Sequence, residues 1–118
     1  MDERILKWLF DIKMSIDEID VFFIDEEKDF FKYKRNLMLK RAVERNLEII
    51  GEAVNRIITR DNAFTEKISN ARAIVGLRNQ VIHAYDNISD EIIWSILTNH
   101  LQKLKLEVEK LIENNNYC

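Results

Sequence analysis

Residues that break helices are almost missing from this chain: its 118 residues include no proline and only two glycines, Gly51 and Gly76. A β-rich domain of this length needs many turns, which Gly and Pro usually form. Leu, Ile, Lys, Glu and Arg are abundant instead, and these residues favour helices. The sequence therefore predicts an all-α protein, and its length fits a single domain spanning residues 1–118.

Apolar residues recur at helical spacing in four regions of the chain. We expect helices over about 2–23, 28–59 and 65–84, the last broken near Ser69 and Asn70, and a final helix from the turn at 86–90 to the Asn114–Asn116 run. Short connections between them predict an antiparallel bundle of about four to five helices. Gly51 falls inside the apolar pattern of the longest helix, where Gly weakens a helix by about 1 kcal/mol relative to Ala, so we expect close packing there.

Charge and cysteine content restrict the classes of function. A net charge of −3 argues against a large basic surface for duplex nucleic acid, although a local basic pocket remains compatible with it. The single cysteine, Cys118, cannot form an internal disulfide, which favours a reducing compartment. No apolar run approaches the roughly 20 residues of a membrane helix, and the first residues do not resemble a signal peptide. We expect a soluble, cytoplasmic protein without a membrane association.

The side chains with the most chemical capacity are concentrated in residues 78–85, which include Arg78, Asn79, His83 and Tyr85. If this stretch is helical, Asn79 and His83 share a face, and Gly76 leaves a notch beside Asn79. Arg78 lies about 140° away from His83 around the helix, so its side chain must bend round or a second surface must complete the site. Arg72 flanks the same face and is a candidate for an additional phosphate contact.

These residue types suit chemistry on a phosphodiester. Arginine offers a planar fork of donors that matches phosphate oxygens, and histidine can accept or donate a proton near neutral pH. RNA carries its own nucleophile, the 2′-hydroxyl, so such a site needs no metal and no cofactor. The sequence has no carboxylate–histidine cluster at metal-ligand spacing and no Gly-rich phosphate loop. Spacing alone still favours the alternative of a solvated arginine and a half-buried histidine.

Two segments resemble a known family. The run from Gly76 to Tyr85 is similar to the signature of the HepT-like toxins of the HEPN superfamily: Arg, four residues, His, any residue and Tyr, with Asn directly after the Arg. The segment from Arg41 to Ala53 is similar to the long helix of that family. Ala84 stands where Gly is more common in the family, at a variable position of the signature.

The resemblance implies a dimeric helical bundle that acts as a metal-independent ribonuclease toxin of a type II toxin–antitoxin pair. The partner antitoxin would be a small nucleotidyltransferase that attaches AMP from ATP to the signature tyrosine. Carried over to this chain, Arg78 and His83 are catalytic, Asn79 supports the site and Tyr85 receives the AMP. RNA is then the substrate, and the protein forms a homodimer.

Two other functions remain open: a non-catalytic helical domain that binds a nucleotidyltransferase or a nucleotide, and a plain dimerising bundle. Several further side chains have simpler explanations than catalysis. We expect His100 to be packed or at the surface, and Trp8 and Trp94 to anchor the core or a dimer. A solvated helix face explains Glu44, Glu48 and Glu52, whose spacing by four places them beside arginines. A packed corner explains the aromatic group around the first turn, namely Phe22, Phe23, Phe30, Phe31 and Tyr33.

Overall fold

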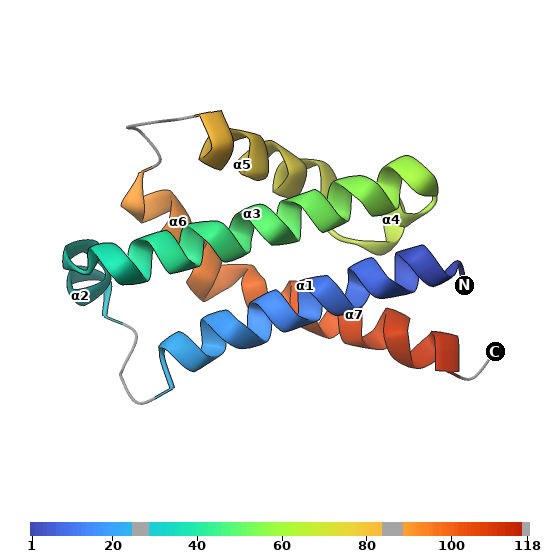
Figure 1. Ribbon diagram of the computed structural model, residues 1–118, viewed down its shortest axis with the longest axis horizontal. Helices are drawn as coiled ribbons and strands as arrows, with labels where there is room; N and C mark the ends of the chain where they lie inside the picture. The colour runs from blue at the N-terminus through green and yellow to red at the C-terminus, as the bar shows by residue number, and fades with distance from the viewer. Residues whose placement is uncertain (25–28, 84–88, 117–118) are drawn as a thin grey trace.

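The computed structural model describes residues 1–24, 29–83 and 89–116, the side chains of residues 81–83 and 116 excepted. All regular structure within these ranges is helical, which confirms the predicted all-α class (Figure 1). Successive long helices run in opposite directions, so the fold is the expected antiparallel bundle. The helices are α1 (Glu3–Phe22), α2 (Phe30–Arg35), α3 (Leu37–Arg60), α4 (Phe64–Lys67), α5 (Ala71–His83), α6 (Asp90–Asn99) and α7 (Leu101–Asn116).

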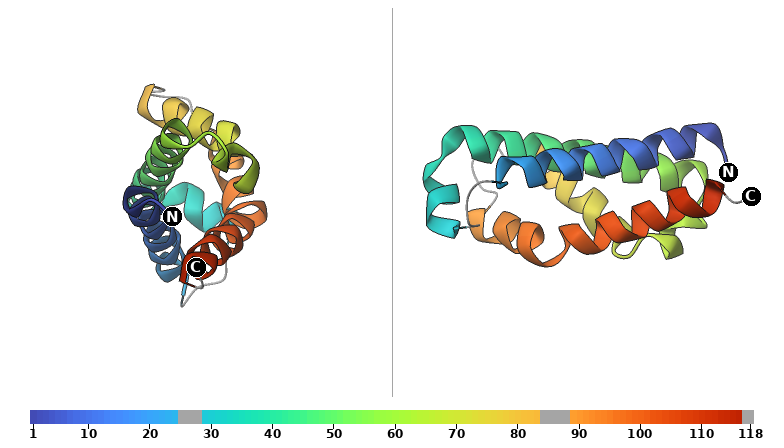
Figure 2. Two further views of the ribbon diagram at one scale, coloured as in Figure 1. Left: turned by 90° about the vertical axis from the view of Figure 1, so that its right-hand side faces the viewer. Right: turned by 90° about the horizontal axis from the view of Figure 1, so that it is seen from below.

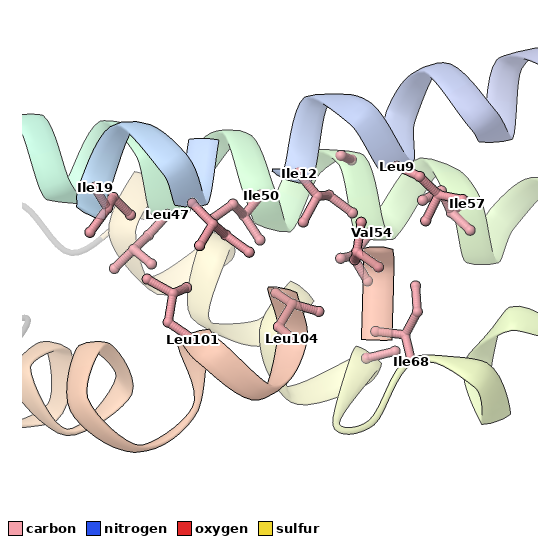
Figure 3. Close-up of a cluster of buried hydrophobic side chains, with 14 of the residues drawn as sticks. Leu9, Ile12, Ile19, Leu47, Ile50, Val54, Ile57, Ile68, Leu101 and Leu104 are labelled. Atoms are coloured by element: carbon pink, nitrogen blue, oxygen red, sulfur yellow. The ribbon is translucent and has the colours of Figure 1, made fainter. Parts of the chain in front are cut away.

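The core lies between α1, α3 and α7, where α1 packs along both of the other two helices (Figure 2). The apolar pattern predicted for each of these helices faces this core. Ile12 of α1, Val54 of α3 and Val108 of α7 have no exposed surface at all. Figure 3 shows side chains such as Leu9 and Leu104 converging from these helices. Burial of these stripes removes apolar surface from water and is the main force that holds the helices together.

The expected helix over residues 28–59 is wrong as a single element, because the chain breaks at Asn36 into α2 and α3. Asn36 has extended backbone angles (φ −101°, ψ 94°), and its side chain accepts a hydrogen bond from the Leu39 backbone N–H at 3.0 Å. The Asn36 backbone N–H donates to the Tyr33 carbonyl at 3.1 Å. An asparagine that caps the following helix in this way competes with continuation of the preceding one.

The final predicted helix is likewise divided, at His100, into α6 and α7. Ser89 caps the start of α6 by accepting a hydrogen bond from the Ile92 backbone N–H. The break predicted near Ser69 and Asn70 is confirmed, and Asn70 adopts the left-handed conformation (φ 60°) that asparagine tolerates. These interruptions explain why the described chain has seven helices where four long regions were expected.

The aromatic group at the first turn forms a packed corner, as predicted. Tyr33 is fully buried, and its ring centroid lies 5.4 Å from that of Trp94. Phe30 and Phe23 lie against the same tryptophan, with centroid separations of 5.9 and 6.1 Å. Phe22 and Phe31 are the exceptions, with 37% and 68% of their surfaces exposed. The corner ties the end of α1 and the short α2 to α6.

Helix α5 lies on the outer side of α3, so that α3 separates it from α1 (Figure 1; Figure 2, left). A largely apolar cavity of about 340 Å³ remains beneath α5, lined by Leu47, Ile50, Ile74, Leu77, Leu104 and neighbouring residues of α6 and α7. No helix in the described part of the chain is both long enough and apolar enough to span a bilayer.

Candidate active site

Helix α5 carries four of the predicted site residues, namely Arg72, Arg78, Asn79 and His83. Arg72, Gly76 and Asn79 are all exposed, which agrees with the face predicted for them. His83 is the last residue of α5, one helical turn beyond Asn79, and its side chain lies outside the described residues. Tyr85 also lies outside them. The structure therefore describes the arginine and asparagine of the signature. The catalytic roles of Arg78 and His83 and the AMP modification of Tyr85 remain predictions.

The close packing predicted at Gly51 is confirmed, and its partner is Arg78. A Cβ atom at Gly51 would overlap the Arg78 Cβ and would lie 2.9 Å from the Arg78 Cγ and 3.2 Å from the Ile74 carbonyl oxygen. Only glycine lets α5 approach α3 at this distance. The first carbons of the Arg78 side chain consequently rest on the backbone of α3.

The Arg78 guanidinium is held at both of its terminal nitrogens. Nη2 lies 2.5 Å from Glu52 Oε2, and Nη1 donates to Asn79 Oδ1 at 2.8 Å. Nε is buried and has no hydrogen-bond partner among the described residues. The side chain is 25% exposed. The Arg78 side chain thus contacts Glu52 on α3 and its chain neighbour Asn79 on α5. Whether it reaches the face of His83 stays a prediction, since the His83 side chain lies outside the described residues.

Glu52 is the site residue that the sequence interpretation missed. Glu44 and Glu48 form the expected pairs within α3, with Arg41 at 3.0 Å and Arg45 at 3.4 Å. Glu52 also pairs within its helix, with Arg56 at 3.1 Å, but its second oxygen reaches Arg78 on α5. The signal was present in Gly51: a helix that packs closely at this glycine must also lie beside residue 52.

The group retains the capacity to bind an anion. Two guanidinium groups, Arg56 and Arg78, surround one carboxylate, Glu52, so one positive charge is in excess. Each terminal nitrogen of Arg78 carries two N–H donors, and Nη1 uses one of its two in the hydrogen bond to Asn79. The remaining donors and the partial exposure of Arg78 suit contact with a phosphate oxygen.

The other histidine named from the sequence, His100, lies elsewhere. His100 is exposed at the junction of α6 and α7, which agrees with its surface interpretation. It lines the cavity beneath α5. Within the described residues, no three or more His, Cys, Asp or Glu side chains are grouped so that they could hold a metal ion.

The fold and the Arg78–Asn79 pair define a class: an all-helical protein with a candidate anion site on its outer helix. The chain matches the model of the family described as "HepT-like: Ribonuclease HepT-like" over residues 12–111. It therefore belongs to the HepT-like ribonuclease family, as the resemblance predicted.

Individual relatives agree with this membership. "Putative RNase MJ1380" of Methanocaldococcus jannaschii is 39% identical over 92% of this chain and 98% of its own length. "Putative RNase MJ0125" of the same organism is 31% identical over 97% of each chain. "Putative RNase TTE0752" of Caldanaerobacter subterraneus subsp. tengcongensis is 32% identical over 78% of this chain and 83% of its own. No solved structure gives a significant match to the chain.

Proposed function

We propose that this protein is a cytoplasmic, metal-independent ribonuclease that acts as the toxin of a toxin–antitoxin pair. One observation supports the proposal most strongly: Arg78 and Asn79 are hydrogen-bonded to each other on α5, the helix that ends at His83. The chain that carries them belongs to the HepT-like ribonuclease family. A half-buried guanidinium with free donors suits a phosphodiester, and RNA is the polymer that supplies its own nucleophile beside each phosphate.

In the proposed reaction, a neutral His83 imidazole removes the proton of an RNA 2′-hydroxyl. The 2′-oxygen attacks the adjacent phosphorus, and the bond from phosphorus to the 5′-oxygen breaks. A protonated imidazole donates its proton to that leaving oxygen. The products are a 2′,3′-cyclic phosphate and a 5′-hydroxyl end. Arg78 stabilises the extra negative charge of the pentacoordinate phosphorane, with Asn79 supporting the site.

The reaction calls for a base and an acid at once, whereas the signature supplies one histidine per chain. A two-fold homodimer brings two copies of the same surface together. In the proposed assembly, His83 and Arg78 of both chains share one cleft. One imidazole is then the base and the other is the acid. Two copies of Arg78 also concentrate positive charge locally in a protein whose net charge is −3.

The proposed antitoxin is a nucleotidyltransferase that attaches AMP to Tyr85, two residues beyond His83 in the sequence. The added phosphate is a bulky anion that competes with RNA for the arginines. We expect the modified chain to bind and cleave RNA more weakly than the unmodified chain. Equal binding and cleavage by the two forms would contradict this account.

The ribonuclease is tested by incubating the purified chain with total RNA in excess chelator and mapping the new ends. We expect fragments with 2′,3′-cyclic phosphates. His83→Ala should lose about 10²- to 10⁴-fold in rate, the usual contribution of general acid–base catalysis. His100→Ala is the matched control, because it removes the other histidine of the chain and should leave the rate unchanged.

A wild-type chain without cleavage would contradict the proposal. If that inactive chain still bound a nucleotidyltransferase or a nucleotide, the non-catalytic partner domain would be the better description. Full activity in His83→Ala would show that cleavage uses another site.

A further inference from the structure

We infer that Glu52, seated beside Gly51, is a positioning residue that fixes the Arg78 guanidinium for phosphate contact. The inference rests on the proposed ribonuclease function. It assigns a role to a carboxylate on α3, one helix away from the signature residues of α5.

The first step is the root of the arginine side chain. Because Gly51 has no side chain, the Arg78 Cβ and Cγ rest directly against the backbone of α3. Ile74, one turn earlier on α5, is also packed here, since its carbonyl oxygen would lie 3.2 Å from a Cβ at position 51. This contact limits the directions in which the Arg78 side chain can leave its helix.

The second step is the end of the side chain. An arginine side chain without partners samples many rotamers, and it loses that freedom only when its guanidinium is bound by other groups. Glu52 holds Nη2 at 2.5 Å and Asn79 holds Nη1 at 2.8 Å. The Arg78 side chain is therefore fixed at its first carbons and at both terminal nitrogens. Of these two contacts, the one to Glu52 joins two opposite charges and is therefore the stronger.

The third step is the carboxylate itself. Its Oε1 accepts a hydrogen bond from Arg56 Nε at 3.1 Å, while Oε2 faces Arg78. Each oxygen of Glu52 therefore has one guanidinium partner. Arg56 holds the carboxylate in place, and the three side chains together keep one excess positive charge. Glu52 thus orients Arg78 without neutralising the site.

The consequence is a preorganised donor. Stabilisation of a transition state is most effective when the donor already points to where negative charge develops, and a displacement of about 1 Å can lower a rate about 100-fold. Arg78 keeps 25% of its side chain exposed, so a phosphate oxygen can still reach it. Removing Glu52 frees the guanidinium to move while leaving the charge of Arg78 in place.

The test measures kcat and KM for RNA cleavage in Glu52→Ala, Glu52→Gln and the matched control Glu48→Gln. Glu48 lies one turn earlier on α3 and pairs with Arg45 rather than with Arg78. We expect Glu52→Ala to lose about 10- to 100-fold in kcat without a rise in KM. Glu52→Gln, which keeps an acceptor oxygen, should recover part of that loss. Glu48→Gln changes the net charge equally and should stay within about twofold of wild type.

A second readout does not depend on activity. The Arg78 Nε–H is buried, so its NMR signal in ¹⁵N-labelled protein should exchange slowly with water. Arg78→Lys identifies the signal. We expect faster exchange in Glu52→Ala and unchanged exchange in Glu48→Gln. A fold defect alone would also alter the backbone amide signals of α1, which serve as the internal reference.

The outcomes separate the two proposals. A wild-type chain without cleavage overturns the ribonuclease proposal and with it the role of Glu52 in cleavage. An active wild type with an unchanged or raised kcat in Glu52→Ala overturns the positioning role alone. Arg78 exchange that is insensitive to Glu52→Ala also overturns it, because the guanidinium would then be held by other contacts.

Discussion

Gly51 and Gly76 both have negative φ angles and lie inside helices, but their surroundings differ. A Cβ at Gly51 would overlap the Arg78 side chain, whereas a Cβ at Gly76 would have no neighbour within 4 Å. We therefore predict opposite effects of alanine. Gly51→Ala should lower the free energy of unfolding by about 1–3 kcal/mol, because two helices must separate. Gly76→Ala should raise it by about 0.5–1 kcal/mol, because alanine restricts the unfolded chain more than glycine does.

Urea unfolding followed by circular dichroism measures both values, and each glycine variant is the control for the other. Gly51→Ala should also lose ribonuclease activity at temperatures where the protein is folded, because the added methyl group would displace Arg78. A Gly51→Ala protein as stable as wild type would contradict this prediction, because α5 could then move away from α3 without lowering the free energy of unfolding.

At the scale of elements, α2 has only six residues and is too short to be stable alone. Tyr33 is its one buried residue and packs on Trp94 of α6. Burial, with smaller contributions from Glu44 and Asp90, raises the pKa of the Tyr33 phenol. The folded state therefore keeps the phenol neutral at pH values where the unfolded chain ionises it, near pH 10. The stability from Tyr33 is complete below that pH and falls as the pH rises above it.

Tyr33→Phe isolates this contribution from the lysines that titrate in the same range. We predict that wild type loses about 1.4 kcal/mol per pH unit more than Tyr33→Phe above pH 10. At pH 7 the variant should be at least as stable, because the Tyr33 hydroxyl is buried without a hydrogen-bond partner among the described residues. Urea unfolding from pH 7 to 11 provides the measurement. Parallel pH profiles for the two proteins would contradict a buried, neutral Tyr33.

The elements also show what the sequence could predict. The apolar stripes gave the helix class and most of the core, because a 3.6-residue period is a local property of the chain. The breaks at Asn36 and His100 were missed because the apolar period continues across them, and only capping and packing end the helices there. Glu52 was missed for a related reason. Its neighbours on α3 predicted an intrahelical pair, whereas its contact with Arg78 depends on how two helices meet.

At the scale of the whole molecule, the packing order leaves α5 at the periphery. One side of α5 packs on α3, while Arg72, Gly76 and Asn79 face outward. The core of α1, α3 and α7 forms without any contribution from that outward face (Figure 2, left). A second copy of the chain can therefore approach the candidate site without disturbing the core. This placement is compatible with the shared cleft proposed above.

The shared cleft predicts a dominant effect of one inactive chain. If base and acid come from different chains, a mixed dimer with one His83→Ala subunit lacks one of them in its single cleft. We expect such a dimer, isolated with two different affinity tags, to lose nearly all cleavage, because general acid and general base act in the same step. A mixed dimer with one His100→Ala subunit, purified in the same way, should keep the wild-type rate. Half the wild-type rate in the His83→Ala mixed dimer would instead assign each chain an independent site, and a chain that is monomeric at assay concentrations would contradict the cleft directly.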